Sequence, residues 1–221
     1  TETTALVANL PDQELRPGSM GKPTFMYEIG IYDEEGNEVP PLEEGVICLK
    51  TEGVKPNGVF REYLGDTDRT QKAFRHGLYY TGDKAYKDTD GYIWFVGRND
   101  DVIKASAYRI GPFEVESVLI EHPEVVEAAV VASPHPVRGN AVKAFVMLRK
   151  GAEPGEGLAA DIFQFSEGLL AKYKVPRIIE FPEALPKTIS GKIRRIELRA
   201  NEAQSKINKE QRTHEYFHQK Y

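Results

Sequence analysis

Short apolar runs separated by turn residues fill the first part of the chain. The runs are rich in β-branched and aromatic residues, and Gly, Pro, Asn and Asp stand between them. They cover residues 25–33, 45–50, 77–83 and 91–98. One stretch, 66–74, has a helical pattern with Asp66 or Thr67 as its N-cap. This part of the sequence predicts a small β-barrel or curled sheet.

After Asp101 helical and strand patterns alternate. A short strand pair at 101–105 and 108–110 precedes a helix that starts at Pro112 and ends near Pro123, and a second helix is predicted at about 158–173. Strand-like runs lie between the two helices, at 125–133 and 141–148, and after the second helix, at 177–181. The segment 201–221 is polar without a clear apolar face, which predicts a frayed helix or a disordered end. The fold class is therefore α+β: a small β-barrel-like subdomain, then a compact α/β domain with a three-stranded sheet and flanking helices.

The charge distribution changes at the same place. Residues 1–99 carry 11 Lys and Arg against 17 Asp and Glu, whereas 100–221 carry 18 against 17, giving a net charge of −5 for the whole chain. We predict domains at 1–99 and 100–205 and a polar tail at 206–221. Neither half is basic enough for a nucleic-acid partner.

Other features restrict the class of protein further. No apolar run approaches the roughly 20 residues of a membrane-spanning helix. The single cysteine, Cys48, lies in an apolar run, which favours a buried strand residue over a nucleophile and fits a reducing compartment. The chain reads as soluble and globular, and a cytoplasmic location is predicted, with the mitochondrial matrix as an alternative.

Two polar clusters flank a predicted hairpin at residues 79–111. A tight turn at Asp90-Gly91 brings Asp83 and Arg98 to one edge of a sheet. A carboxylate and a guanidinium placed in this way can hold a diol such as a ribose. The alternative is a surface ion pair of small energy. A second candidate is Lys192, which follows Gly191 in the loop PKTISGKIRR.

Four ordered motifs resemble the adenylate-forming superfamily, which contains the acyl-CoA synthetases. They are Thr-Gly-Asp at 81–83, Gly-Arg-x-Asp-Asp-x-Ile-Lys at 97–104, Arg-Ile-x-x-x-Glu-Val-Glu at 109–116 and Pro-Lys-Thr-x-x-Gly-Lys at 186–192. The run 135–148 resembles the acetate and medium-chain acyl-CoA branch. The opening TETT resembles the end of a motif that closes with Thr-Glu. The resemblance therefore implies a missing N-terminal part, with residues 1–99 as the last subdomain of the large domain and 100–205 as the C-terminal lid.

The resemblance implies a two-step reaction in which a carboxylic acid reacts with ATP, and CoA then displaces AMP. It assigns Lys192 to catalysis, because an ammonium stabilises the charge where carboxylate and phosphate meet. It assigns Asp83 and Arg98 to the ribose and Asp100 to a hinge. Thr1 matches a phosphate contact and Glu2 a Mg²⁺-associated carboxylate.

For CoA the resemblance implies a path along 106–109. Its residues are Ser106, Ala107, Tyr108 and Arg109, with Arg138 reaching a CoA phosphate. A surface charge explains Arg138 equally well. Where the family has Gly, this chain has Ala107, whose methyl group is expected to crowd the pantetheine path or to disfavour a positive φ.

Some residues are not assigned to a metal. Asp88 and Asp90 in KDTDGY fit a turn better than a metal loop, and His76, His122 and His135 lack partners at ligand spacing. Two alternatives remain open from the sequence. One is an adenylation domain that loads a carrier-protein thiol. The other is a nucleotide- or CoA-binding module that is inactive by itself.

Overall fold

The computed structural model describes residues 2–53 and 55–218. They form two compact units, an N-terminal unit of Thr1–Asp100 and a C-terminal unit of Asp101–Tyr221. Each unit is described below by itself. Among the described residues, every helix is too short or too polar to cross a lipid bilayer.

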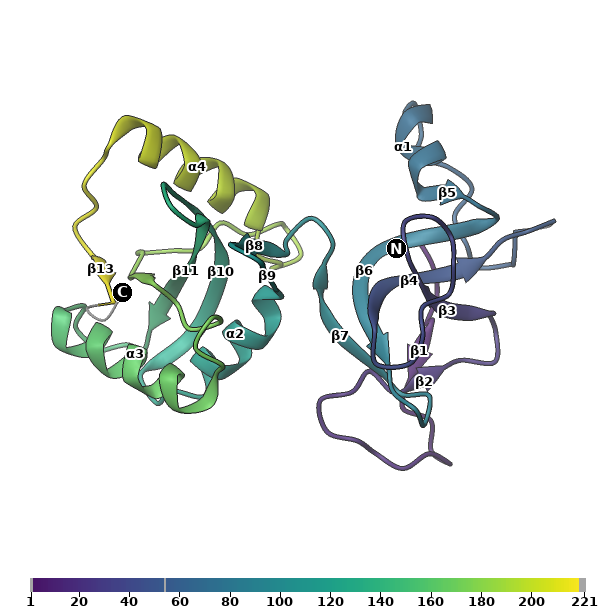
Figure 1. The fold of residues 1–221 in the computed structure, drawn as a ribbon, viewed down its shortest axis with the longest axis horizontal. Coiled ribbons are helices and arrows are strands. Elements are labelled where there is room, and N and C mark those ends of the chain that lie inside the picture. Colours follow the sequence, from purple (N-terminus) through teal and green to yellow (C-terminus); the bar gives the residue numbers. More distant parts are fainter. Residues whose placement is uncertain (1, 54, 219–221) are drawn as a thin grey trace. The chain divides into compact units, whose positions relative to one another are not determined.

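The N-terminal unit is built around a curled five-stranded sheet. Its central order is β3-β4-β6-β5, and β7 pairs with β6 (Figure 1). The small β1–β2 pair lies outside this sheet. The elements are β1 (Val7–Ala8), β2 (Lys22–Pro23), β3 (Ile29–Tyr32), β4 (Glu44–Lys50), α1 (Thr67–Ala73), β5 (Phe74–Arg75), β6 (Leu78–Lys87) and β7 (Ile93–Arg98). The sequence prediction of a curled sheet is confirmed.

The strand β6 organises this unit because it pairs along both of its edges. One edge pairs with β4, with a register shift between Val46 and Cys48, and the other pairs with β5 at its start and β7 at its end. Side chains that alternate along the strands enter separate apolar clusters, as for Tyr80 and Tyr79. The predicted N-cap at Asp66 is also present, since its side chain accepts a hydrogen bond from the Arg69 amide.

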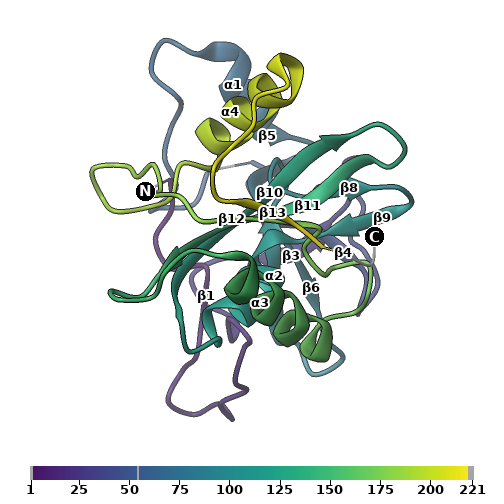
Figure 2. The ribbon, with the colours of Figure 1, turned by 90° about the vertical axis from the view of Figure 1, so that its left-hand side faces the viewer.

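The C-terminal unit is a four-stranded sheet covered on both faces. Its strand order is β10-β11-β12-β13, and a separate hairpin is formed by β8 and β9. Helices α2 and α3 pack on one face and α4 packs on the other (Figure 1; Figure 2). The elements are β8 (Ile103–Ala105), β9 (Tyr108–Ile110), α2 (Pro112–Ile120), β10 (Val125–His135), β11 (Gly139–Leu148), α3 (Glu156–Leu169), β12 (Ile178–Glu180), α4 (Arg195–Asn208) and β13 (Glu215–Phe217).

Burial on both faces explains why β10 and β11 read as nearly continuous apolar runs. Val130 and Ala144 point into the larger core beneath α2 and α3, whereas Ala129 and Phe145 point into the smaller core beneath α4. Helix α3 ends earlier than predicted because Leu170 is already extended, at φ −106° and ψ 150°.

The sheet has four strands rather than the three predicted, and the predicted frayed helix or disordered end is ordered as far as residue 218. A fourth strand, β13, pairs antiparallel to β12, with Ile179 opposite Tyr216. Helix α4 extends through Asn208, and its buried positions are Leu198, Glu202 and Ser205. Two of these three residues are polar, so the helix has a buried face that an apolar pattern does not reveal.

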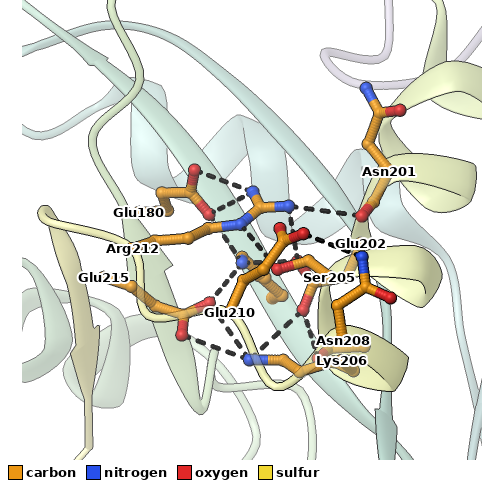
Figure 3. A network of polar contacts seen from close by, with 11 residues as sticks. Glu180, Asn201, Glu202, Ser205, Lys206, Asn208, Glu210, Arg212 and Glu215 are labelled. Atoms are coloured by element: carbon orange, nitrogen blue, oxygen red, sulfur yellow. Dashed lines mark hydrogen bonds and ion pairs between the residues drawn. The ribbon is translucent and has the colours of Figure 1, made fainter.

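A network of buried charged side chains holds the buried face of α4, where apolar contacts are few. Glu180, Glu202 and Glu215 come together in this network (Figure 3). Lys143 on β11 is fully buried, and its ammonium lies 2.6 Å from carboxylate oxygens of both Glu202 and Glu180 and also contacts Glu215. The Ser133 hydroxyl donates to Glu202 at 2.6 Å. Burial opposes ionisation of Glu202, but the hydrogen bonds from Lys143 and Ser133 outweigh it and lower the pKa of this carboxyl. The network thus joins β11, β12, β13 and α4 by fully partnered charges.

Candidate functional site

The N-terminal unit brings Asp83 and Arg98 together as the hairpin pattern predicts. The two residues are directly opposite in the β6–β7 register, and Arg98 Nη1 donates to Asp83 Oδ1 at 3.1 Å. The side chain of Asp83 is 36% exposed and that of Arg98 50% exposed. Both groups therefore remain accessible to a ligand. Burial raises the pKa of Asp83, and the Arg98 charge opposes this shift.

Gly82 allows this close approach. It has a φ of +79°, and a Cβ atom at this position would lie 3.1 Å from Arg98 Nη2. The Gly82 carbonyl also accepts from the Asn99 amide at 2.8 Å, which ties the ends of β6 and β7 together. A larger residue would be strained and would press on the guanidinium.

Other predicted residues of this unit lie near the same edge. The charge of Glu2 contributes to the raised pKa of Asp83, and the Tyr63 hydroxyl donates to Glu2 at 3.4 Å. Asp100 Oδ1 lies 3.6 Å from Arg98 Nε. Thr1 lies outside the described residues. The role of Glu2 with a metal stays a prediction.

A hollow of about 270 Å³ adjoins this edge. Basic side chains outnumber acidic ones in its lining, which includes Arg69, Lys72, Arg75, Arg98 and Glu34. The local field therefore favours an anion. A hollow of about 630 Å³ in the C-terminal unit, between α3 and β13, contains none of the predicted site residues.

In the C-terminal unit Lys192 is displayed on a short ordered loop. The Thr188 hydroxyl accepts from the Lys192 amide at 3.0 Å, and the Thr188 amide donates to the Lys192 carbonyl at 2.8 Å. Gly191 takes φ +83°, in the left-handed region that favours glycine. Among the described residues the Lys192 ammonium has no hydrogen-bond or ion-pair partner, and the residue is exposed. Backbone hydrogen bonds thus fix the loop, while the Lys192 ammonium stays accessible to a ligand.

The hairpin β8–β9 gathers the residues predicted for the CoA path. Ser106 and Ala107 form its turn, and Tyr108 and Arg109 begin the second strand. The Ser106 amide donates to the Arg138 carbonyl at 2.9 Å, although the two residues are far apart in sequence. The side chains of Arg109 and Arg138 are exposed.

Two details of this hairpin differ from the sequence reasoning. Ser106 takes the left-handed conformation, at φ 53°, and Ala107 does not. The expected backbone strain at Ala107 is therefore absent, and only the crowding argument stays a prediction. In addition, the Tyr108 ring stacks on Tyr173 with a centroid distance of 4.2 Å. Sequence reasoning missed Tyr173 because it placed this residue at the end of a helix.

The residues that were not assigned to a metal have structural partners. The Asp88 carboxylate accepts from the amides of Asp90 and Tyr92 and from the Trp94 indole, as in a turn. His135 Nδ1 accepts from the amides of Val137 and Arg138, and the His122 ring contacts Asp161. These contacts fix the orientation of the Asp88, His122 and His135 side chains.

Two family models match the chain. "AMP-binding enzyme" matches residues 1–64, and "AMP-binding enzyme C-terminal domain" matches residues 114–192. The chain is 54% identical over 217 residues to 4-hydroxybutyrate–CoA ligase 1 of Metallosphaera sedula. The matched region covers 98% of this chain and 38% of that ligase. The chain belongs to the adenylate-forming superfamily.

Further relatives of this superfamily are similar along most of the chain. The mitochondrial acyl-coenzyme A synthetase ACSM3 of Mus musculus is 47% identical over 204 residues. The matched region covers 91% of this chain and 35% of the length of ACSM3. The crystal structure of the anthranilate CoA ligase AuaEII in complex with anthranoyl-AMP has a TM-score of 0.83 at 38% identity, and covers 91% of this chain and 38% of that one. The chain therefore spans little more than a third of the length of these relatives.

Proposed function

We propose that this chain is part of an AMP-forming acyl-CoA synthetase, and that Lys192 is its catalytic residue. In the first step a carboxylate oxygen attacks the α-phosphorus of ATP, and pyrophosphate leaves. In the second step the CoA thiolate attacks the acyl carbonyl carbon, and AMP leaves with the former carboxylate oxygen. The observation that carries the proposal is the exposed Lys192 on a loop fixed by backbone hydrogen bonds, with no partner for its ammonium among the described residues, in a chain of the adenylate-forming superfamily.

The electrostatic demand of the first step explains the choice of Lys192. Two anions meet at the α-phosphorus, and a preorganised cation lowers the barrier because it needs no reorganisation during the reaction. A Lys ammonium is compact and reaches both partners as a point charge. Gly191 and Thr188 hold the Lys192 backbone in a loop.

We assign the nucleotide contacts to the N-terminal unit. Asp83 accepts from the ribose hydroxyls and Arg98 donates to the ribose, which their exposure and mutual placement support. The basic hollow beside them supports the approach of an anion. A carboxylate such as Glu2 fits Mg²⁺ when substrate phosphates complete the coordination, and Thr1 is assigned to the phosphates. The ion would supply charge neutralisation on the phosphates.

We assign the thiol step to the hairpin β8–β9 and its neighbours. Ser106, Ala107, Tyr108 and Arg109 follow the pantetheine path, and Arg138 contacts a CoA phosphate. Asp100 is the hinge about which the C-terminal unit rotates between the two half-reactions. The division of the chain into two units at this residue supports this assignment. Relatives named as ligases of CoA support CoA as the acceptor and a small carboxylic acid as the substrate.

The test is pyrophosphate exchange into ATP by the complete protein that contains this chain. We expect exchange only when a carboxylic acid is added, and a loss of about 100- to 1,000-fold in Lys192→Ala. Lys187→Ala is the matched control, because Lys187 lies in the same loop but pairs with Glu127 at 2.7 Å. Exchange that is equal in Lys192→Ala and the wild type would disprove the assignment.

A further inference from the structure

The loop that carries Lys192 is continuous with a helix whose start is held by a buried carboxylate. Arg195 is the first residue of α4, and its Nε and Nη2 atoms donate to Glu116 at 3.0 and 2.6 Å. Glu116 lies on α2 and is 5% exposed. Its Oε1 atom also accepts from the Val130 amide of β10 at 2.8 Å. One carboxylate thus links α2, β10 and the start of α4.

This contact has the properties of a rigid anchor. A two-pronged Arg–carboxylate pair fixes direction as well as distance. A buried carboxylate that loses its cation is costly, so the pair does not open readily. Burial opposes the Arg195 charge, but the hydrogen bonds to Glu116 outweigh it and raise the pKa of the guanidinium. The Arg195 side of the anchor is therefore charged at any pH at which the protein is folded.

A short loop, closed at its base by backbone hydrogen bonds, connects the Glu116–Arg195 pair to Lys192. The Arg194 amide donates to the Pro186 carbonyl at 2.8 Å, and Lys187 and Ile193 form an isolated β-bridge. The loop is thereby closed at its base, two residues after Lys192. One turn further along α4, Arg199 pairs with Asp101, the first residue of the unit. The side chain of Lys192 has no partner among the described residues, so its position depends on these backbone anchors.

We propose that Glu116 and Arg195 are positioning residues that hold Lys192 in place for adenylation. The proposal rests on the proposed function, in which Lys192 acts in the first half-reaction only. Loosening the anchor therefore slows acyl-adenylate formation and leaves thioester formation from a supplied acyl-adenylate intact. A purely structural role of the pair would lower both half-reactions together.

The test measures the two half-reactions separately in the complete protein. For Glu116→Gln we expect pyrophosphate exchange to fall about 10- to 100-fold, mainly in kcat, as for a catalytic group displaced by about 1 Å. Arg195→Lys keeps the charge but loses the two-pronged geometry, and we expect a loss of about tenfold. Thioester formation from acyl-adenylate and CoA is expected within about twofold of wild type in both variants.

Glu114→Gln is the matched control. It lies on the same helix and pairs with Lys174 at 2.5 Å, but its side chain is 52% exposed, and among the described residues it forms no ion pair with α4. We expect exchange within about twofold of wild type. If Glu116→Gln does not fold, Arg195→Lys alone tests whether the pair positions Lys192. Normal exchange in Arg195→Lys, or equal losses in both half-reactions, overturns the positioning role. Normal exchange in Lys192→Ala instead overturns the proposed function itself.

Discussion

Replacing Lys143 by Met tests the buried network of the C-terminal unit. The substitution removes the cation at the centre of Glu180, Glu202 and Glu215 and leaves a chain of similar size (Figure 3). Glu180 keeps Arg212 at 2.8 Å and Glu215 keeps Lys206 at 3.1 Å. Glu202 is therefore the carboxylate that loses most of its neutralising charge in Lys143→Met.

The magnitude follows from what remains around Glu202. Its other cations are Lys206 at 3.5 Å and Arg212 at 3.7 Å, which is too far for a good hydrogen bond. Breaking a buried pair by removing one partner costs about 3–5 kcal/mol. Because the neighbouring cations offset part of the charge, we expect about 3 kcal/mol. With a urea slope of about 1.5 kcal/mol per M, the unfolding midpoint falls by about 2 M.

The chain provides two probes for this measurement. Its single tryptophan, Trp94, lies in the N-terminal unit, whereas far-ultraviolet circular dichroism follows both units. We expect Lys143→Met to shift the dichroism transition and to leave the Trp94 fluorescence transition unchanged. Lys187→Met is the control, since the exposed Lys187–Glu127 pair contributes about 0–1 kcal/mol.

The effect also depends on pH with a defined sign. The folded pKa of Glu202 lies below its ordinary value of 4.5, so its contribution is present above that value and is lost as the pH falls through the folded pKa. In Lys143→Met the chief hydrogen bond that lowers this pKa is absent, and Glu202 is protonated at a higher pH. The difference from wild type should therefore shrink between pH 7 and pH 4. A midpoint shift below about 0.5 M at pH 7, or an equal shift at both pH values, would refute this reasoning.

Two further predictions concern the N-terminal unit. Gly82→Ala is expected to cost about 1–2 kcal/mol, because alanine is strained at φ +79° and its Cβ presses on Arg98; the Trp94 urea transition measures this, and an unchanged midpoint would contradict it. Burial raises the pKa of the Cys48 thiol, so we expect no reaction with a disulfide reagent at pH 8 until urea unfolds the unit. Rapid labelling of the folded chain would show that the thiol is accessible.

The sequence predicted elements whose buried faces are apolar. The pairing of Asp83 with Arg98 across a hairpin was predicted correctly, but the tight turn at Asp90-Gly91 was not. The loop spans residues 88–92, and a register shift between Lys84 and Ala85, which the sequence pattern does not reveal, brings Asp83 opposite Arg98. The helix at Pro112 was also predicted, since Val115 and Leu119 form an apolar stripe. Local pattern was sufficient for this helix but not for the register of the hairpin.

The C-terminal segment was mispredicted because its contacts are polar and distant in sequence. Glu202 and Ser205 occupy the buried face of α4. The partner of Glu202, Lys143, lies on a strand some 60 residues earlier. The same limit applies to the candidate site. Motifs identified Lys192, whereas the contact of Arg195 with Glu116 spans 79 positions and appears only when the unit is folded. Tyr173 was missed because the sequence pattern placed it at the end of a helix, and only its stacking on Tyr108 indicates a role near the hairpin.

The most direct test of an acyl-adenylate mechanism follows one oxygen atom. The complete protein is incubated with ATP, CoA and a carboxylic acid labelled with ¹⁸O in both carboxyl oxygens, and the nucleotide product is analysed by mass spectrometry. Attack of the carboxylate on the α-phosphorus transfers one labelled oxygen to AMP when the thiol displaces it. We expect AMP that carries one ¹⁸O atom and a thioester that retains the other. Unlabelled AMP, or ADP with labelled phosphate, would contradict the proposed reaction.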